Sequence, residues 1–263
     1  MLAMPLIALL LAASVPVCPP QKLQAARFLP GEVLSFRLDA LGADVGTFEV
    51  RVQPAPRGEK RAALELASRA KTSAFVSTNV GRYDAFATAL MAPDFSVLRY
   101  HEDVDEGPLH RAVQLDFPPV SGTLSVQATR NGEPEPFTLP AGSAVRDILS
   151  TLYFLRAQSM KPGTPVCVEV YAGRKIWRLS GQVGGRETID TPLGRMASVR
   201  IDADAVRVDD PKMKRGAHVW VSDDDRRLPL VAVGEVRGKV IRAQLVEVTG
   251  NGKRRLAEGD QRR

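Results

Sequence analysis

The sequence predicts an all-β protein with one packed helix, built as a strongly curved antiparallel sheet or open half-barrel. Three observations lead to this fold class. Apolar and polar residues alternate along most of the chain between residues 28 and 248, which is the period of half-buried strands. Gly, Pro, Asn and Asp interrupt the alternation about every ten to fifteen residues, as tight turns require. Only one segment has a helical period.

About a dozen segments have the alternation expected of a strand with one solvent-facing side. Turn residues such as Pro30-Gly31, Asn131-Gly132 and Gly184-Gly185 separate them. So many short strands at this spacing are typical of an antiparallel sheet, a sandwich or an open barrel. In chain order the segments span residues 33–41, 46–52, 62–68, 96–104, 109–117, 122–130, 165–171, 175–183, 196–206, 218–224, 228–236 and 240–248.

A single helix is expected at about residues 144–158. Apolar residues recur at helical spacing within Val145–Gln158, Ser143 can cap the N-terminus, and Pro162-Gly163 follows the C-terminus. Either two β lobes or one curved sheet would accommodate this helix. We favour one curved sheet with the helix on its concave face, because neither half of the chain contains a second helix to cover an exposed sheet face.

The N-terminus predicts export. Residues 1–17 are uncharged and apolar over a length typical of a signal peptide and too short for a membrane span, so the mature protein is expected to be periplasmic or secreted, with no transmembrane helix. A lipoprotein form is disfavoured, because Val17 occupies the position where lipid modification of Cys18 requires a small residue. We expect a flexible lead-in at 18–27, a single β domain at 28–248 and a disordered polar tail at 249–263.

Composition and cysteine content limit the function classes. The chain has 263 residues, 44% of them hydrophobic and 25% charged, with a net charge of +6, as in an ordinary globular protein with a mildly basic surface. Lys and Arg are scattered and lack the aromatic-plus-basic strand motifs of nucleic-acid binding, which we therefore do not expect. A disulfide between Cys18 and Cys167 is allowed in an oxidising compartment, but a small buried core residue is the favoured interpretation of Cys167.

No motif in the sequence carries recognisable catalytic or metal-binding chemistry. The three histidines, His101, His110 and His218, form neither a helical pair nor a cluster with cysteine, so no zinc or other metal is expected. No Gly-x-Ser-x-Gly elbow accompanies them, which argues against a hydrolase. The acidic segments 101–107 and 223–225 are interpreted as charged turns rather than calcium loops. We expect no cofactor.

Arg156 is the most unusual residue of the predicted helix. A helical wheel places it inside the apolar arc that also contains Tyr153. A guanidinium keeps its charge when buried and so requires a carboxylate or several carbonyls. The favoured interpretation is an internal ion pair or carbonyl clamp, with Asp190, Asp202 or Asp224 as candidate carboxylates. The alternatives are an anchor for an anionic headgroup, with Arg156 and Tyr153 as ligand-binding residues, and a side chain that reaches solvent.

Several motifs together resemble one bacterial family of exported proteins, domain of unknown function 3108. They are Pro30-Gly31-Glu32 before a strand, the helix Asp147…Tyr153…Arg156, Thr191-Pro192-x-Gly194, and Asp224-Asp225 followed by Pro229. The resemblance covers roughly residues 28–248 and implies an exported β-rich protein without an established activity. For the motif residues Asp147, Gly194, Asp224 and Pro229 we expect structural roles. We further expect the fold to be similar to the curved half-barrels of periplasmic lipoprotein carriers.

These observations favour an exported, non-enzymatic envelope protein that binds an apolar or amphipathic ligand, such as a lipid, in a concave sheet. The alternative is a structural or protein-interaction component of the cell envelope that meets an envelope protein through its sheet edges.

Overall fold

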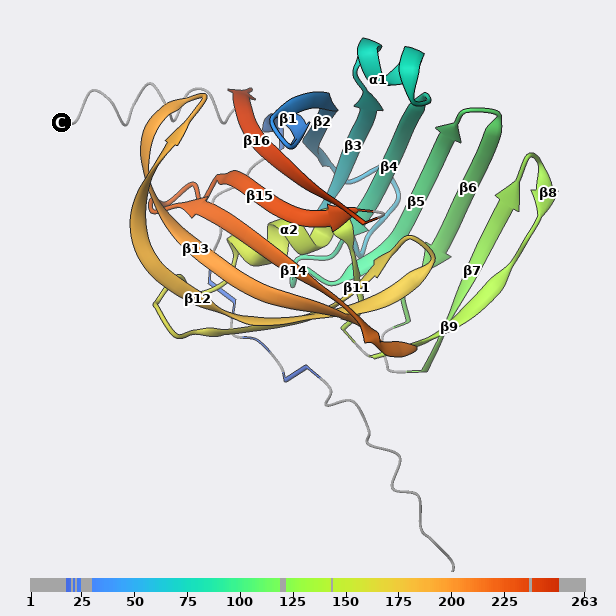
Figure 1. Ribbon diagram of the computed structural model, residues 1–263. Helices are drawn as coiled ribbons and strands as arrows, with labels where there is room; N and C mark the ends of the chain where they lie inside the picture. Colours follow the sequence, from blue (N-terminus) through green and yellow to red (C-terminus); the bar gives the residue numbers. More distant parts are fainter. Residues whose placement is uncertain are drawn as a thin grey trace, which may run out of the picture.

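The computed structural model describes residues 18–19, 21, 23–24, 30–118, 122–142, 144–236 and 238–250 (Figure 1). The predictions for residues 1–17 and 251–263 and the expected cap at Ser143 lie outside these residues. Of the described residues, 66% lie in strands and 7% in helices. The prediction of an all-β fold class is therefore confirmed.

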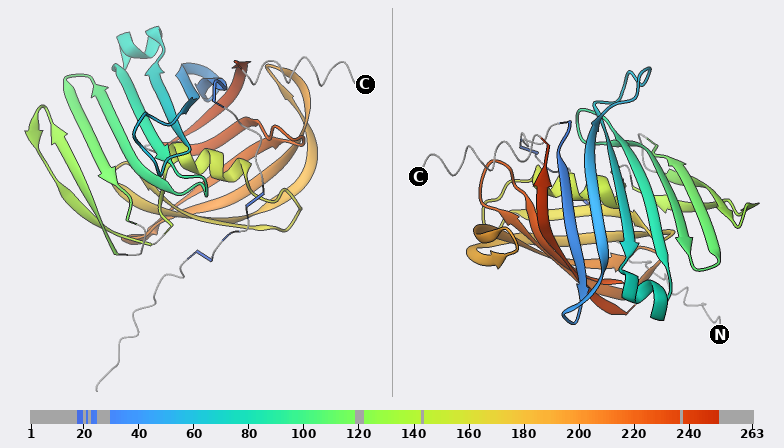
Figure 2. Two further views of the ribbon diagram at one scale, coloured as in Figure 1. Left: turned by 180° about the vertical axis from the view of Figure 1, so that it is seen from behind. Right: turned by 90° about the horizontal axis from the view of Figure 1, so that it is seen from above.

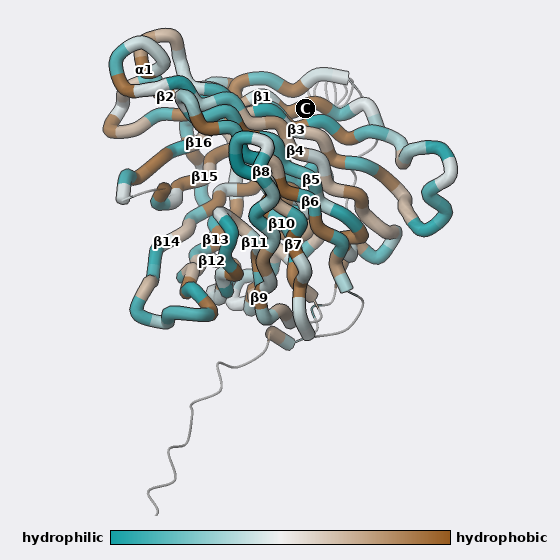
Figure 3. The backbone as a smooth tube through the Cα atoms, turned by 90° about the vertical axis from the view of Figure 1, so that its right-hand side faces the viewer, coloured by the Kyte–Doolittle hydropathy of each residue, from teal (hydrophilic) through white to brown (hydrophobic). Residues whose placement is uncertain are grey.

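Sixteen strands and two helices make up the described part of the chain. They are β1 (Val33–Ala40), β2 (Ala43–Pro54), β3 (Leu64–Thr72), α1 (Ala74–Asn79), β4 (Tyr83–Met91), β5 (Val97–Glu106), β6 (Leu109–Asp116), β7 (Gly122–Arg130), β8 (Glu133–Pro134), β9 (Phe137–Ala141), β10 (Arg146–Asp147), α2 (Ile148–Arg156), β11 (Pro165–Ala172), β12 (Lys175–Thr191), β13 (Gly194–Arg207), β14 (Asp210–Ser222), β15 (Pro229–Val236) and β16 (Lys239–Thr249). Within these strands hydrophobic and hydrophilic residues alternate, as Figure 3 shows by colour.

All sixteen strands belong to one sheet with the order β10-β11-β12-β13-β14-β15-β16-β1-β2-β3-β4-β5-β6-β7-β8, and β9 also pairs with β7. Neighbouring strands are antiparallel, except that β10 and β11 are parallel. β16, the last strand, pairs with β1, the first, in the middle of the sheet order. In the described residues the sheet's own ends, β10 and β8, do not pair with each other, and the sheet stays open.

The sheet is rolled so that its β10–β12 end lies against the inner face of β5–β9. The rings of Tyr171 and Tyr100 meet edge to face at 6.1 Å between centroids. The Gly142 amide donates to Glu169 Oε2 at 3.0 Å, which ties the segment after β9 to β11. These contacts join the two ends through side chains without closing the barrel. Seen from above, the strands wrap around α2 (Figure 2, right).

Helix α2 lies in the concavity, as the sequence predicted, but it begins at Ile148 rather than near residue 144. Asp147 is its N-cap: the carboxylate accepts from the amides of Leu149 at 2.7 Å and Ser150 at 3.0 Å. The two residues before the helix, Arg146 and Asp147, form strand β10, which pairs with β11. Seven of the nine helix residues are buried, so the helix fills the base of the curved sheet instead of merely covering it.

Two apolar clusters pack on opposite sides of α2. Leu149 and Tyr153 belong to the larger cluster, formed with β1–β7 and with residues of β11, β12, β15 and β16. Phe154 and Leu155 belong to the cluster formed with β11–β14. The helix thus joins the two walls of the sheet. Within the described residues no helix has the length and apolar character needed to cross a bilayer.

The sequence missed several elements. β4 was not predicted, because inward Ala85, Ala87 and Ala89 give it too little hydrophobic contrast for its alternation to stand out. The short strands β8, β9 and β10 were also missed. Helix α1 was missed because it has no buried residue and hence no apolar periodicity, although Ser73 caps it.

The interpretation of Cys167 as an unpaired core residue was wrong. Cys167 in β11 forms a disulfide with Cys18, 149 residues earlier in the sequence. The segment expected to be a flexible lead-in is fastened at a second point, since the Gln24 amide donates to the Ala157 carbonyl at 2.7 Å. Sequence spacing could not show this, because the two cysteines come together only when β11 folds against the base of α2.

Candidate functional site

Arg156 is buried with zero exposure and is held by the carboxylate of Glu32, which was not among the predicted partners. Arg156 Nη1 and Nη2 donate to Glu32 Oε1 and Oε2 at 2.6 and 3.0 Å. Nε and Nη2 also donate to the carbonyls of Arg227 and Arg226 at 3.1 and 3.0 Å. Burial alone would lower the pKa of Arg156, but the facing carboxylate raises it. The arrangement combines an ion pair with a carbonyl clamp.

Tyr153, the other proposed ligand-binding residue, is also fully buried in this arrangement. Its hydroxyl donates to Glu32 Oε1 at 3.3 Å, and its ring centroid lies 4.8 Å from the Arg156 guanidinium carbon. Burial raises the pKa of Tyr153. A headgroup could reach Arg156 only by displacing Glu32, so neither side chain is exposed to a ligand in this structure.

The remaining motif residues shape the turns around this ion pair. Asp224 Oδ1 accepts from the amides of Arg226 and Arg227 at 3.0 and 3.2 Å, which directs their carbonyls toward Arg156. Pro229 then opens β15 opposite Val221. Because Glu32 follows Pro30-Gly31, three of the sequence motifs converge on one buried junction. The residues of these motifs therefore hold the start of β1, the end of α2 and the β14–β15 turn together.

Gly194 lies apart from that junction, in the turn between β12 and β13. Its φ of 103° is in the region that glycine adopts without strain. The Thr191 hydroxyl donates to the Gly194 carbonyl at 2.7 Å and accepts from the Leu193 amide at 3.1 Å, closing the turn.

The inner face of the sheet beside α2 bounds the interior of the rolled sheet, which we call the lumen. Residues paired directly across neighbouring strands lie on the same face of the sheet. Val168 and Val170 pack against α2 and therefore lie on the inner face, and the strand register then shows which residues of the other strands share that face. Many wall positions carry small side chains. The lumen wall comprises Leu179, Gly181, Ile201, Ala203, Ala205, Ala217, Val219, Ala232, Gly234, Ile241, Ala243, Leu38, Phe36 and Phe48.

Side chains of the lumen wall are buried at one end, the base, and partly exposed at the other, which we call the open end. Along β13, Val199 and Ile201 are 0% and 2% exposed, whereas Ala203 and Ala205 further toward the β13–β14 turn are only half-buried. The same gradient runs along β1, β14 and β16, where exposure increases away from the Glu32–Arg156 pair. The open end is therefore the one that carries the β13–β14, β15–β16 and β1–β2 turns.

Helix α2 also contributes an apolar stripe to the lumen. Ile148 is 57% exposed and Leu152, one turn later, is half-buried, while the other helix residues are buried. Near the open end, the Arg215 guanidinium carbon lies 4.7 Å from the ring centroid of Trp177, which pairs with Val170 of β11. The open end thus combines an apolar wall with an aromatic side chain and a cation in contact with it.

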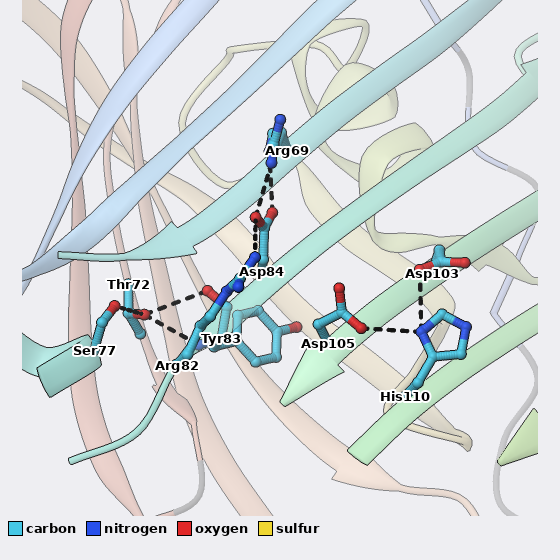
Figure 4. Close-up of polar contacts among 9 residues, drawn as sticks. All are labelled: Arg69, Thr72, Ser77, Arg82, Tyr83, Asp84, Asp103, Asp105 and His110. Atoms are coloured by element: carbon cyan, nitrogen blue, oxygen red, sulfur yellow. Dashed lines mark hydrogen bonds and ion pairs between the residues drawn. The ribbon is translucent and has the colours of Figure 1, made fainter. Parts of the chain in front are cut away.

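The outer face of β3–β6 carries a separate polar ladder (Figure 4). Arg69 donates to both carboxylate oxygens of Asp84 at 3.0 and 2.8 Å. His110 Nδ1 lies 3.0 Å from Asp105 and 3.7 Å from Asp103. The hydrogen bond to Asp105 and the charge of Asp103 raise the pKa of His110. These are exposed ion pairs of the kind that contribute little to stability.

The residues of Figure 4 do not form a nucleophile–base pair. The Ser77 hydroxyl lies 2.8 Å from that of Thr72, and Thr72 in turn contacts the Tyr83 backbone. In the described parts of the chain, no group of three or more His, Cys, Asp or Glu is arranged to hold a metal.

A half-open pocket of about 400 Å³ lies at the base, where the N-terminal segment meets the α2–β11 loop. It is outside the lumen. The residues that line it are Gln21, Gln24, Gln158, Ser159, Lys161, Thr164 and Pro165.

The chain belongs to the family described as protein of unknown function, DUF3108, whose model matches residues 34–240. This confirms the resemblance noted in the sequence. Among solved structures, a β-barrel-like protein of the DUF1849 family from Brucella abortus is similar, with a TM-score of 0.57 and 8% identity over 87% of this chain and 99% of that one. That likeness shows a shared fold. No curated protein matches this chain.

Two further solved structures were found at lower similarity. One, from Bacteroides fragilis, has a YmcC-like fold and carries the provisional description of an exported protein; its TM-score is 0.37 at 9% identity, over 86% of this chain and 98% of that one. The other, from Parabacteroides distasonis, is provisionally described as a lipoprotein; its TM-score is 0.36 at 8% identity, over 88% of this chain and 100% of that one.

Sequence reasoning predicted the helix and a concave face beside it, but not which residues line the lumen. The signal was present, since alternate residues of several predicted strands are Ala or Gly, as in Ala203 and Ala205 or Ala232 and Gly234. Those residues line an open space only because their strands lie side by side on one face, which no single strand reveals.

Proposed function

We propose that this protein is an exported, non-enzymatic protein that binds an apolar or amphipathic ligand in the lumen. The observation that carries the proposal is the burial gradient of the lumen wall, from fully buried at the Glu32–Arg156 pair to half-buried Ala and Gly at the open end. A folded sheet seldom leaves an apolar inner face partly exposed unless something occupies it. The Cys18–Cys167 disulfide supports export, because disulfides persist in oxidising compartments.

The chemistry of the lumen favours a long apolar group over a sugar or a metal. Its wall is apolar, and the helix adds Ile148 and Leu152. The polar groups near the opening, Arg215 with Glu235, suit a ligand with one polar end. The alternative, docking through sheet edges, has less support, because β10 and β8, at the ends of the sheet, are only two residues long.

The two tryptophans make the proposal testable. Trp177 faces the lumen, whereas Trp220 lies on the opposite face, where its indole nitrogen donates to Glu187 at 2.6 Å. A brominated fatty acid that enters the lumen should quench the fluorescence of a Trp220→Phe variant and leave that of a Trp177→Phe variant nearly unchanged. Equal quenching of the two variants would contradict lumen binding.

A blocking variant provides a second test. Ala217→Trp should fill the lumen and reduce the amount of acyl chain that co-purifies, as measured by mass spectrometry of natively purified protein. Thr47→Trp, at an exposed position on the outer face of β2, is the matched control and should retain the ligand. Loss of ligand from both variants would indicate misfolding, and retention in both would refute the site.

A further inference from the structure

We propose that the open end of the lumen docks on the surface of a lipid bilayer through a rim of exposed apolar turn residues. This inference goes beyond ligand binding, and a variant with a blocked lumen separates the two in its test. The rim is defined by six exposed side chains at that end, which lie in α1 or its C-cap, in the β1–β2 turn, or in strands close to the β13–β14 and β15–β16 turns. They are Leu41, Phe75, Val80, Met213, Val236 and Val240.

The distribution of exposed large apolar residues is uneven. Of the eight in the described residues, six belong to the rim; the other two are Ile148 in the lumen and Phe86 on the outer face of β4. Leu41 is 101% exposed, Val80 81% and Phe75 72%. Scattered single apolar residues are normal on a protein surface, but a concentration at one end marks an interaction site.

Strand register places the rim residues at one end of the sheet. Ala40 pairs with Ala43 around the Leu41 turn, and the neighbouring Asp39 pairs with Arg242, just after Val240. On the other side of β2, Gly46 pairs with Thr72, immediately before α1. Figure 2 (right) shows the β1–β2 turn, the β15–β16 end and α1 at the same edge.

Helix α1 holds its apolar residues outward through polar contacts at its base. The Ser73 hydroxyl accepts from the Val76 amide at 3.4 Å and donates to the Asp44 carbonyl at 3.2 Å, and the Thr72 and Ser77 hydroxyls are 2.8 Å apart (Figure 4). None of the residues of α1 is buried. Because tertiary packing supplies most of the stability of a short helix, contact with a partner surface would stabilise α1.

A bilayer fits this rim better than a protein partner does. The apolar side chains sit on separate projecting turns, and a fluid surface can accept them without the close shape match that a protein interface requires. Basic residues lie between them. Four of these basic residues are exposed and form no ion pair in the described part of the chain: Lys71, Lys212, Lys239 and Arg242. Asp39 and Asp44 are acidic neighbours. Such cations favour anionic headgroups.

The test is flotation of the purified full chain with vesicles of phosphatidylethanolamine and phosphatidylglycerol, and with vesicles of phosphatidylcholine. The wild type should float with the anionic vesicles and less with the neutral ones, and salt should weaken the association. Phe75→Ser combined with Val80→Ser should lower the vesicle-bound fraction by at least about tenfold. The matched control, Phe86→Ser, removes an exposed aromatic residue outside the rim and should not change binding. Circular dichroism and thermal melting confirm that each variant folds.

Several results would overturn the proposal: wild-type protein that stays unbound, a rim variant that floats normally, or a Phe86→Ser variant as impaired as the rim variant. A dimer in sedimentation that the rim substitutions abolish would assign the rim to a second copy of the chain instead. The Ala217→Trp variant separates this proposal from lumen binding, because it should carry no acyl chain and still float.

Discussion

The substitution Arg156→Met tests whether the buried ion pair is structural. It keeps the apolar stem of the side chain but leaves Glu32, which is 4% exposed, facing an uncharged group, and it frees the carbonyls of Arg226 and Arg227. Removing one partner of a buried ion pair costs about 3–5 kcal/mol. For a chain of this size that corresponds to a fall in melting temperature of about 10 °C. Urea unfolding under non-reducing conditions measures the free energy directly.

The double variant Arg156→Met with Glu32→Leu is the control. It removes both charges, so its loss of stability should be smaller than that of Arg156→Met alone, and a double-mutant cycle should give strong coupling between the two positions. A loss below about 1 kcal/mol for Arg156→Met would refute the structural role. If Arg156→Met caused so small a loss of stability and also abolished ligand co-purification, Arg156 would be an anchor for the ligand's headgroup.

Three further predictions concern groups elsewhere in the fold. Replacing Cys18 and Cys167 with Ser should lower the free energy of unfolding by about 2–4 kcal/mol, because the disulfide closes a long loop; urea unfolding would measure this, and an unchanged midpoint would contradict it. Burial raises the pKa of Glu102, so its ionisation opposes folding as the pH rises above the unfolded value; Glu102→Gln should therefore stabilise the protein at neutral pH and lose this advantage in acid. NMR titration should find the pKa of His110 above its usual value, and Asp105→Asn should lower it; an unchanged titration curve would show that Asp105 is not its partner.

How much could be predicted from sequence depended on how local the cause was. The strands of alternating residues and the helix around Tyr153 were found because hydrophobic periodicity is a property of a short segment. The burial of Arg156 followed from the same periodicity. Its partner did not, because Glu32 lies more than a hundred residues earlier and reaches Arg156 only through the order of strands in the sheet. β4 and α1 were missed because their apolar and polar positions differ too little for periodicity to reveal them.

The amino-acid sequence alone determined the all-β class, the single packed helix, the signal-peptide prediction and the family, because each depends on composition or on patterns within short stretches. Only the tertiary structure decided which residues meet. It brought Cys18 to Cys167 and Glu32 to Arg156. It also aligned the Ala and Gly positions of neighbouring strands into one open wall and gathered the exposed turns at its rim. These features arise from strand order and from the direction in which the sheet rolls, which are set by the packing of the whole chain rather than by any one segment.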